Sequence, residues 1–243
     1  MKIIGIIPAR YKSTRLEGKP LADIDGKPMI QHVYERASKS KKLDDLLVAT
    51  DDQRIIDAVN KFGGKAVLTS EKHPSGSDRV AEVAKKLDAD IVVNVQGDEP
   101  FINPEMIDEV VEPFENKSLL MATLMHEVLD ESDFENPNVV KVVVNREGFA
   151  LYFSRSLIPY PRNRIDFHVY EHIGLYSYRK DFLLKLTKLP PTPLERIESL
   201  EQLRALENGY KIKVILTRKE YIPLSIDTEE DLKKAREYIK KSK

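Results

Sequence analysis

The chain has no cysteine and no tryptophan, and its charges nearly cancel. Without cysteine it can form neither a disulfide nor a thiolate metal site. With 39 basic and 40 acidic residues, it lacks the large basic excess that a nucleic-acid surface needs. It also lacks any apolar run as long as a membrane helix, and its N-terminus has no signal-peptide pattern. We therefore expect a cytoplasmic protein with neither a nucleic-acid partner nor a membrane segment.

A cluster of positive charge follows directly on the first apolar run, residues 3–7. The run predicts a strand that is covered on both faces, and we expect Pro8 to end it because proline lacks the ladder N–H. Ligands of open α/β sheets bind outside the carboxyl ends of the strands, so the cations predict a polyphosphate site. The alternative is a solvated basic loop. The cluster and its hydroxyl neighbours are Arg10, Lys12, Ser13, Thr14, Arg15 and Lys19, with Gly18 as the flexible point.

This loop matches neither of two common phosphate motifs. A P-loop requires G-x-x-x-x-G-K-[ST], but here Gly18-Lys19 is followed by Pro20. A dinucleotide fingerprint requires G-x-G-x-x-G, and no three glycines of the chain have that spacing. Phosphates at this loop would therefore be held mainly by side chains.

Strand-like and amphipathic helical runs alternate over the first half of the chain, and 41% hydrophobic residues suffice for a full core. This alternation predicts an α/β fold with a parallel sheet wrapped by helices. The pattern changes after residue 137, where a hairpin over residues 139–153 is expected, then an irregular segment and a strand over 173–178.

The end of the chain predicts a helix over residues 196–208, a strand over 211–217 and a helix over 228–240. Because no linker or repeat interrupts the sequence, we expect one domain over residues 1–243. Residues 137–178, approximately, are expected to form a hairpin or lid and a dimerisation element on it.

Two aspartates are candidates for a metal site. The apolar run DIVVNV ends in Gly97-Asp98, which puts a carboxylate at the same sheet edge as the basic loop. Mg²⁺ typically takes one or two protein carboxylates together with substrate phosphates and water. Asp227, which precedes a predicted helix, is the candidate second ligand. The alternatives are that Asp227 is the N-cap of that helix and that Asp98 is a plain turn residue.

Residues 73–79, HPSGSDR, form a hydroxyl-rich loop ahead of another predicted helix. Small polar side chains and backbone amides at a helix N-terminus suit the recognition of a base or a phosphate. The alternative is simple capping by Ser77, with Arg79 on the surface.

A group of arginine, histidine and tyrosine residues lies in the irregular middle of the chain. Such side chains suit an acidic, polyhydroxylated substrate, because arginine can hold a carboxylate in a bidentate pair. A partner interface is the alternative, since interfaces also favour tyrosine and arginine. The group comprises Arg155, Arg162, Arg164, His168, Tyr170, Glu171, His172 and Tyr176, followed along the chain by Glu201-Gln202.

Seven blocks, spread from the N-terminus to the last helix, closely resemble the 3-deoxy-manno-octulosonate cytidylyltransferases. The blocks are IIPARYKSTRLEGKPL, HPSGSDR, VVNVQGDEP, SRSLIPYPR, YEHIGLYSYR, SLEQLR and SIDTEEDL. The first and third are specific in combination and only suggestive alone. Glu17 departs from the family pattern, which has proline before Gly-Lys-Pro-Leu, whereas Arg15 and Lys19 keep their places.

The resemblance implies a Rossmann-like nucleotidyltransferase fold, a three-layer sandwich with a mostly parallel sheet and a β-rich insertion in the second half. It implies transfer of CMP from CTP to 3-deoxy-D-manno-octulosonate (KDO), which gives CMP-KDO and pyrophosphate. Mg²⁺ is the implied cofactor, and lipopolysaccharide biosynthesis is the implied pathway. A homodimer is also implied, with residues 161–170 at the contact.

Residues that match the family's motifs carry implied roles. The implied nucleotide site comprises Pro8, Ala9, Arg10, Ser13, Arg15, Lys19, Ser75, Gly76 and Ser77. The implied metal ligands are Asp98 and Asp227, which form the catalytic set together with Lys19 and Arg15. The implied sugar-acid site comprises Gln96, Arg155, His172, Tyr176, Glu201 and Gln202.

Three other functions remain open at this point. The substrate could be a related 2-keto sugar acid, of the 8-amino-KDO or sialic-acid type. A nucleotide-sugar-dependent glycosyltransferase could share the sheet, but its usual D-x-D element is not matched by Asp98-Glu99-Pro100. A non-catalytic nucleotide-binding protein could keep the basic loop without needing both aspartates.

Overall fold

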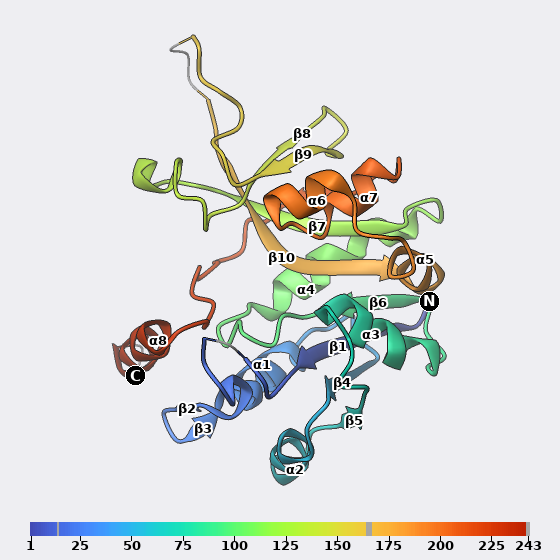
Figure 1. Cartoon of the computed structure of the whole chain (residues 1–243), viewed down its shortest axis with the longest axis vertical. Helices are drawn as coiled ribbons and strands as arrows, with labels where there is room; N and C mark the ends of the chain where they lie inside the picture. The colour runs from blue at the N-terminus through green and yellow to red at the C-terminus, as the bar shows by residue number, and fades with distance from the viewer. Residues whose placement is uncertain (14, 164–166, 242–243) are drawn as a thin grey trace. The chain divides into compact units, whose positions relative to one another are not determined.

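The computed structural model describes residues 1–13, 15–163 and 167–241. The chain divides into two compact units (Figure 1). The first unit contains Met1–Asp108 and Lys219–Lys243, and the second contains Glu109–Arg218. None of the helices formed by the described residues is both long enough and apolar enough to cross a membrane.

The first unit is built on four parallel strands. Their order across the sheet is β6 (Ile91–Asn94), β1 (Ile3–Ala9), β4 (Asp45–Thr50) and β5 (Ala66–Leu68). The pairings β1–β6, β1–β4 and β4–β5 are all parallel. Strand β1 lies between two neighbours, which explains the burial of its side chains, with Ile6 and Ile7 fully inaccessible. The carboxyl ends of these strands therefore meet at one edge.

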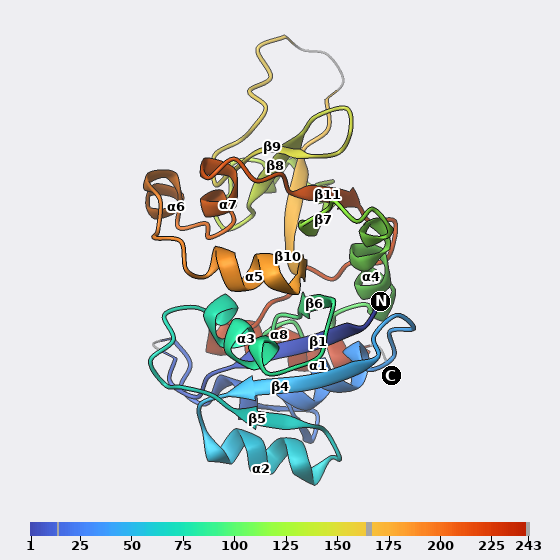
Figure 2. The ribbon, with the colours of Figure 1, turned by 90° about the vertical axis from the view of Figure 1, so that its right-hand side faces the viewer.

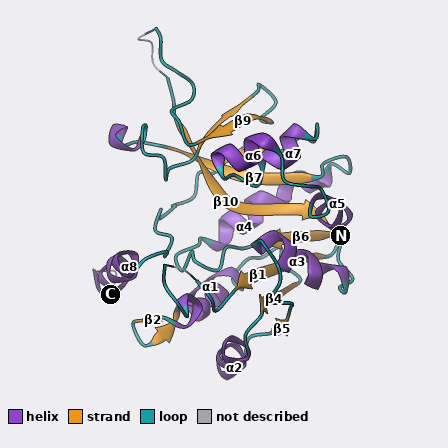
Figure 3. Ribbon diagram, in the orientation of Figure 1, coloured by secondary structure: helices purple, strands orange, loops and turns teal. Residues whose placement is uncertain are grey.

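Helices cover both faces of this sheet, α1 (Met29–Ala37) and α2 (Gln53–Lys61) on one face and α3 (Gly76–Lys85) on the other (Figures 2 and 3). Helix α1 packs on β1 and β4, and α2 packs on β4 and β5. Helix α3 packs on β1, β4 and β6. The chain moves outward from β1 to β5 and then returns to β6, so right-handed crossovers put α3 on the face opposite α1 and α2.

The C-terminal segment of the first unit packs against the segment that follows the basic loop. A short helical turn, η1 (Lys19–Leu21), and a hairpin of β2 (Asp23–Ile24) and β3 (Lys27–Pro28) lie between the loop and α1. The last helix is α8 (Glu229–Lys241). A buried cluster joins these parts, and its members are Leu16, Ile24, Met29, Phe101, Ile226, Leu232 and Ala235.

The second unit has a mixed sheet. Strand β7 (Met121–Glu127) pairs antiparallel with β10 (Tyr170–Arg179) and parallel with β11 (Lys213–Leu216). The predicted hairpin is present as β8 (Lys141–Val144) and β9 (Ala150–Ser154), and β8 also pairs with β10.

Several short helices complete the second unit. They are η2 (Glu112–Glu115), η3 (Glu131–Asp133), α5 (Lys180–Leu186), α6 (Pro193–Glu198) and α7 (Leu203–Glu207). The remaining helix, α4 (Pro104–Val111), contains the position at which the two units divide.

Two expectations about local structure are wrong. A single helix over residues 196–208 does not form, because Ser199 adopts a left-handed conformation with φ of 53° and separates α6 from α7. Strand β1 continues through Pro8 to Ala9. The Pro8 carbonyl faces Gly97, on the side where pairing with β6 has already ended at Ile6, so the missing N–H of Pro8 breaks no ladder bond.

Candidate functional site

A pocket of about 330 Å³ opens in the first unit, where β1 and β6 end. Its lining combines the basic loop, the 73–79 loop, the Gly97-Asp98 turn and Asp227. The lining residues are Pro8, Ala9, Arg10, Ser13, Arg15, Lys19, Pro20, His73, Pro74, Ser75, Gly76, Arg79, Gln96, Gly97, Asp98 and Asp227. The strand-end rule therefore brings together segments from the start, the middle and the end of the chain.

One ammonium group connects the two candidate metal ligands. Lys19 Nζ donates to Asp98 Oδ2 at 2.8 Å and to Asp227 Oδ1 at 3.1 Å. Arg15 Nη2 also contacts Asp227 Oδ1, at 3.0 Å. The Lys19 side chain is 15% exposed, and the two carboxylates are each about one-third exposed. These ion pairs are charge-assisted and partly shielded from water, so they hold the two acids at one place.

Close backbone packing places Asp98. A Cβ atom added to Gly97 would lie 2.5 Å from the Pro8 carbonyl oxygen, so only glycine lets the β6 end approach β1 this closely. The Asp98 carbonyl then accepts the backbone N–H of Ile226 at 2.9 Å. Because Ile226 is fully buried, this bond fixes the neighbouring Asp227 beside Asp98.

Asp227 does not serve as the N-cap of α8. That role belongs to Thr228, whose hydroxyl accepts from the Asp231 backbone N–H at 3.2 Å, while Asp231 accepts from the Thr228 N–H at 2.9 Å. Burial alone would raise the pKa of Asp231, but hydrogen bonds from the Thr228 side chain and from the Asp227 and Thr228 backbone together outweigh it and lower the pKa. The Asp227 carboxylate is thereby left to face Lys19 and Arg15.

The donor set of the acid pair fits a magnesium ion. Asp98 and Asp227 supply hard carboxylate oxygens, and within residues 1–13, 15–163 and 167–241 no third histidine, cysteine or acid joins them in a metal-binding group. Mg²⁺ is commonly held by one or two carboxylates, with phosphate oxygens and water in the remaining positions. The absence of a larger protein cage is therefore compatible with Mg²⁺ that arrives with a nucleotide.

Tyr11 braces the basic loop. Its carbonyl accepts the Gly18 N–H at 2.9 Å, and its ring lies 3.1 Å from where a Gly18 Cβ would be. The guanidinium of Arg54, held on Asp52 at 2.9 and 2.7 Å, stacks on the same ring with 3.4 Å to its centroid. The side-chain bond from Arg54 also lowers the pKa of Asp52. Thr14, an expected hydroxyl donor in this loop, lies outside the described residues.

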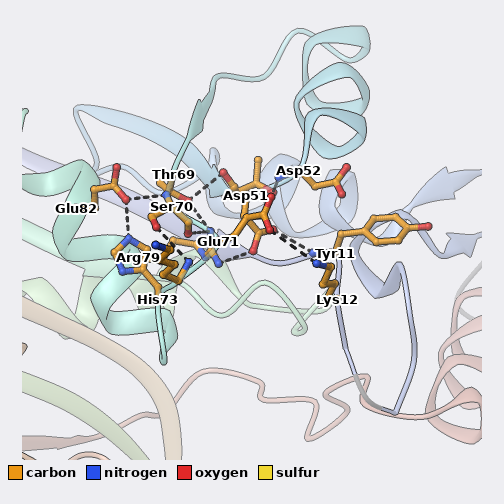
Figure 4. Close-up of polar contacts among 12 residues, drawn as sticks. Tyr11, Lys12, Asp51, Asp52, Thr69, Ser70, Glu71, His73, Arg79 and Glu82 are labelled. Atoms are coloured by element: carbon orange, nitrogen blue, oxygen red, sulfur yellow. Dashed lines mark hydrogen bonds and ion pairs between the residues drawn. The ribbon is translucent and has the colours of Figure 1, made fainter.

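The 73–79 loop is held by a buried ion pair that the sequence did not predict (Figure 4). Arg79 is only 3% exposed, and its guanidinium donates to Asp51 Oδ2 at 2.7 Å and to Thr69 Oγ1 at 2.5 Å. Asp51 also accepts the Tyr11 N–H at 3.4 Å, so the pair connects the two loops that line the pocket.

The alternative of capping by Ser77 with Arg79 on the surface is therefore wrong. Ser75 is the N-cap of α3, since its hydroxyl accepts the Asp78 N–H at 3.1 Å. Ser77 is buried within the first turn of that helix. Asp51 comes directly after the apolar strand β4, at the sheet edge where ligands bind, and this signal would have identified it.

Polar contacts also fix the 73–79 loop on its other side (Figure 4). His73 Nε2 lies 2.6 Å from Glu82 Oε2, which accepts the Ser70 N–H at 2.9 Å. These two contacts lower the pKa of Glu82, the backbone bond contributing more. At the loop surface, Lys12 approaches Glu71 at 3.7 Å, but both side chains are mostly exposed, so this pair contributes little.

The expected sugar-acid residues are divided between the units: Gln96 lines the pocket of the first unit, and the others belong to the second. Arg155 donates to the carbonyl oxygens of Glu198 at 2.7 Å and Pro137 at 2.8 Å. Its neighbourhood is tied down by the fully buried Lys141, whose ammonium donates to three backbone carbonyls, including that of Arg155 at 2.8 Å. Arg164, from the same group of arginines, lies outside the described residues.

His172 and Tyr176 both stay uncharged at neutral pH. Burial lowers the pKa of His172 to about 3 and raises the pKa of Tyr176 well above its usual value. Their rings lie 5.3 Å apart, and His172 Nε2 is 3.0 Å from Thr123 Oγ1. The Thr123 hydroxyl has a single proton, which it donates towards the carbonyl oxygens of Ile173 and Leu175. It must therefore accept from His172, and we assign the Nε2–H of His172 as the donor.

Comparison with known proteins places this chain among the cytidylyltransferases. The family model described as Cytidylyltransferase matches residues 4–214. A 3-deoxy-manno-octulosonate cytidylyltransferase from Fusobacterium nucleatum is 54% identical over all of this chain and 98% of its own length. One from Geotalea uraniireducens is 54% identical over 99% of this chain and its whole length.

Solved structures agree. A CMP:2-keto-3-deoxy-manno-octonic acid synthetase complexed with CTP has a TM-score of 0.93 and 44% identity, with both chains fully covered. A 4-diphosphocytidyl-2C-methyl-D-erythritol synthase from Anaerococcus prevotii, at 18% identity and a TM-score of 0.64, shares the fold alone. The chain belongs to the 3-deoxy-manno-octulosonate cytidylyltransferase family. The predicted Rossmann-like fold class is thereby confirmed.

Replacement of Gly18 by alanine tests the brace on Tyr11. Gly18 and Gly26 both have positive φ, 68° and 83°, but only at Gly18 would the new methyl group meet a ring. We expect Gly26→Ala to lower the free energy of unfolding by about 1 kcal/mol and Gly18→Ala by about 2 kcal/mol, measured by urea denaturation. Equal losses would show that the Tyr11 contact adds no constraint.

The neutral state of His172 predicts a pH dependence of stability. Its pKa is about 3 in the folded protein, against about 6.5 when unfolded, so the unfolded chain binds more protons between these values. The stabilisation is complete above pH 6.5 and is lost as the pH falls, by about 2 kcal/mol at pH 5.

The matched variant is His172→Gln, which keeps an N–H donor for Thr123 but does not titrate. Urea denaturation at pH 7 and pH 5 should show a smaller loss for this variant than for the wild type. Other histidines titrate in both proteins and cancel in the comparison. Parallel losses in the two proteins would rule out a neutral His172 in the folded protein.

Proposed function

We propose that this protein transfers the cytidylyl group of CTP to KDO, with release of pyrophosphate, as a Mg²⁺-dependent step of lipopolysaccharide biosynthesis. The observation that carries the proposal is the meeting of Lys19, Asp98 and Asp227 in one pocket at the strand ends. Two comparisons support the proposal: members of the family are named 3-deoxy-manno-octulosonate cytidylyltransferase, and one solved relative is a complex with CTP.

The pocket suits a nucleoside triphosphate. One side of the pocket is formed by the basic loop, with Arg10, Ser13, Arg15 and Lys19. The arginines and the lysine would neutralise the phosphates, and the Ser13 hydroxyl could donate a hydrogen bond to them. On the other side, Ser75 and Gly76 begin α3, where backbone amides and the Ser75 hydroxyl would face the cytidine, with Pro8 and Ala9 beside them. Ser77 is proposed to act through this helix turn.

Transfer would proceed by in-line substitution. The anomeric hydroxyl oxygen of KDO forms a bond to the α-phosphorus, the bond from that phosphorus to the β-phosphate oxygen breaks, and the hydroxyl proton is lost to solvent. Such transfers depend mostly on positioning and on the neutralisation of charge. Lys19 and Arg15 would offset the charge that develops on the pyrophosphate. Asp98 and Asp227 would hold Mg²⁺, whose chemistry when bound is the polarisation of phosphate oxygens.

The sugar acid is proposed to bind Gln96, Arg155, His172, Tyr176, Glu201 and Gln202. Uncharged His172 and Tyr176 suit hydroxyl groups, and Arg155 suits a carboxylate. Gln202 supports this role because it is 5% exposed and its side-chain amide nitrogen has no hydrogen-bond partner among the described residues. A buried donor of this kind is costly unless a ligand satisfies it.

We also propose a cytoplasmic homodimer, in which residues 137–178 supply the lid and the dimer contact. The exposed large side chains of Leu151 and Tyr160 in this region, 61% and 81% accessible, favour such a contact. The chain would remain one functional domain of 243 residues.

The proposed reaction is tested by following pyrophosphate release from CTP and Mg²⁺ with KDO, 8-amino-KDO and a sialic acid as acceptors. We expect turnover with KDO, and Asp98→Asn should lower kcat at least 100-fold at saturating Mg²⁺ while the fold is kept, because the metal loses one charged ligand. Equal kcat in the variant would remove Asp98 from the metal site. Turnover with none of the acceptors would contradict the proposed function.

The role of the basic loop is tested by two matched substitutions. Arg15 lines the pocket and contacts Asp227, whereas Lys12 points to Glu71. We expect Arg15→Ala to lower kcat/KM for CTP by about tenfold or more, the effect of one charge-assisted contact, and Lys12→Ala to change it less than threefold. A reversal of this order would mean that Arg15 belongs to the surface.

A further inference from the structure

Lys19 occupies the position that a cation shared by Asp98 and Asp227 would take. Its Nζ bonds one oxygen of each carboxylate, at 2.8 and 3.1 Å, and the side chain is 15% exposed. The same lysine lines the pocket in which the proposed phosphates would lie. It therefore stands between two sets of partners, the acid pair and the nucleotide, and both prefer a positive charge.

The charges at this place already balance without any ion. Asp98 and Asp227 contribute two negative charges, and Lys19 and Arg15 contribute two positive charges within 3.1 Å of them. A divalent ion that approached this neutral group would gain no net attraction and would have to displace a partly buried ammonium. The acid pair alone is thus a poor site for a free divalent cation.

A triphosphate changes this balance. It brings several negative charges into the pocket and offers Lys19 new oxygen partners, which its four-carbon stem can reach by rotation. Once the ammonium turns to the phosphates, the two carboxylates keep only Arg15 as a positive partner, which leaves one negative charge and free carboxylate oxygens. Nucleotide and metal would then assist each other's binding, as linkage requires when one ligand removes an obstacle to the other.

We propose that Lys19 is a built-in counter-cation that closes the acid pair to free divalent ions until a nucleoside triphosphate draws it away. The proposal rests on the proposed function for the identity of the nucleotide. The closing of the acid pair depends only on the three side chains and their contacts.

Manganese binding to the nucleotide-free protein tests the closing step. Mn²⁺ is titrated and the free ion is followed by electron paramagnetic resonance, a readout that is independent of activity. We expect Lys19→Met to bind one Mn²⁺ at least tenfold more tightly than the wild type, and Lys19→Arg, which keeps the cation, to behave like the wild type. Adding Asp98→Asn to Lys19→Met should abolish the gain, which places the ion at the acid pair.

Two outcomes of this titration would overturn the proposal. One is equal Mn²⁺ affinity in the wild type and Lys19→Met, with circular dichroism showing that the variant is folded. The other is a gain that survives the added Asp98→Asn change, because the ion would then lie elsewhere.

Nucleotide binding without metal tests the release step. Calorimetric titration with CTP in EDTA should show binding by the wild type, a loss of at least tenfold in Lys19→Met and a smaller loss in Lys19→Arg. Equal CTP affinities in the wild type and Lys19→Met would overturn the release step. A wild type that fails to bind CTP in EDTA would also overturn the release step. It would leave the proposed Mg²⁺-dependent reaction to the pyrophosphate assay, and the manganese titration would still decide whether Lys19 closes the acid pair.

Discussion

The structure of the pocket depends on one ammonium group that meets two carboxylates. Lys19 is 79 positions from Asp98 and 208 from Asp227 along the chain, yet its Nζ contacts both. Two carboxylates and an ammonium are costly to bring into a partly enclosed site unless they neutralise one another. The fold must therefore deliver the basic loop, the end of β6 and the C-terminal segment to the same few ångströms. The packing of the first unit brings these three segments together.

Apolar packing brings the three segments close together, and the ion pairs then fix the charged side chains against one another. The buried cluster that contains Leu16, Ile24 and Ile226 joins the segment after the basic loop to the C-terminal segment. Since Ile226 directly precedes Asp227, burial of its side chain fixes the carboxylate next to it. Gly97 lets β6 end against the Pro8 carbonyl, which fixes Asp98 in turn. Hydrophobic burial is non-directional, so backbone contacts of this kind supply the precision that an ion pair needs.

The sequence predicted the parts of the fold that follow from local pattern. Alternating strand and helix runs gave the parallel sheet, and the strand-end rule placed Asp98 and the basic loop at one edge. It could not foresee that Arg79 is buried, because a helical arginine looks exposed until Asp51 and Thr69 close around it. The break at Ser199 and the continuation of β1 through Pro8 also depend on tertiary neighbours. Roles of individual site residues remain predictions of the family resemblance.

The two groups of candidate residues use opposite electrostatic means, which suits the two substrates of the proposed reaction. In the first unit, Arg15, Lys19 and the acid pair are charged and partly solvated, so they can exchange partners when a polyanion arrives. In the second unit, burial keeps His172 and Tyr176 neutral, and a neutral donor or acceptor binds a hydroxyl without the cost of desolvating an ion. A polyphosphate needs neutralisation of its charge, whereas a sugar needs directional hydrogen bonds. The uncharged His172 and Tyr176 are thus matched to the hydroxyl groups of the proposed sugar acid, and Arg155 of the same group is matched to its carboxylate.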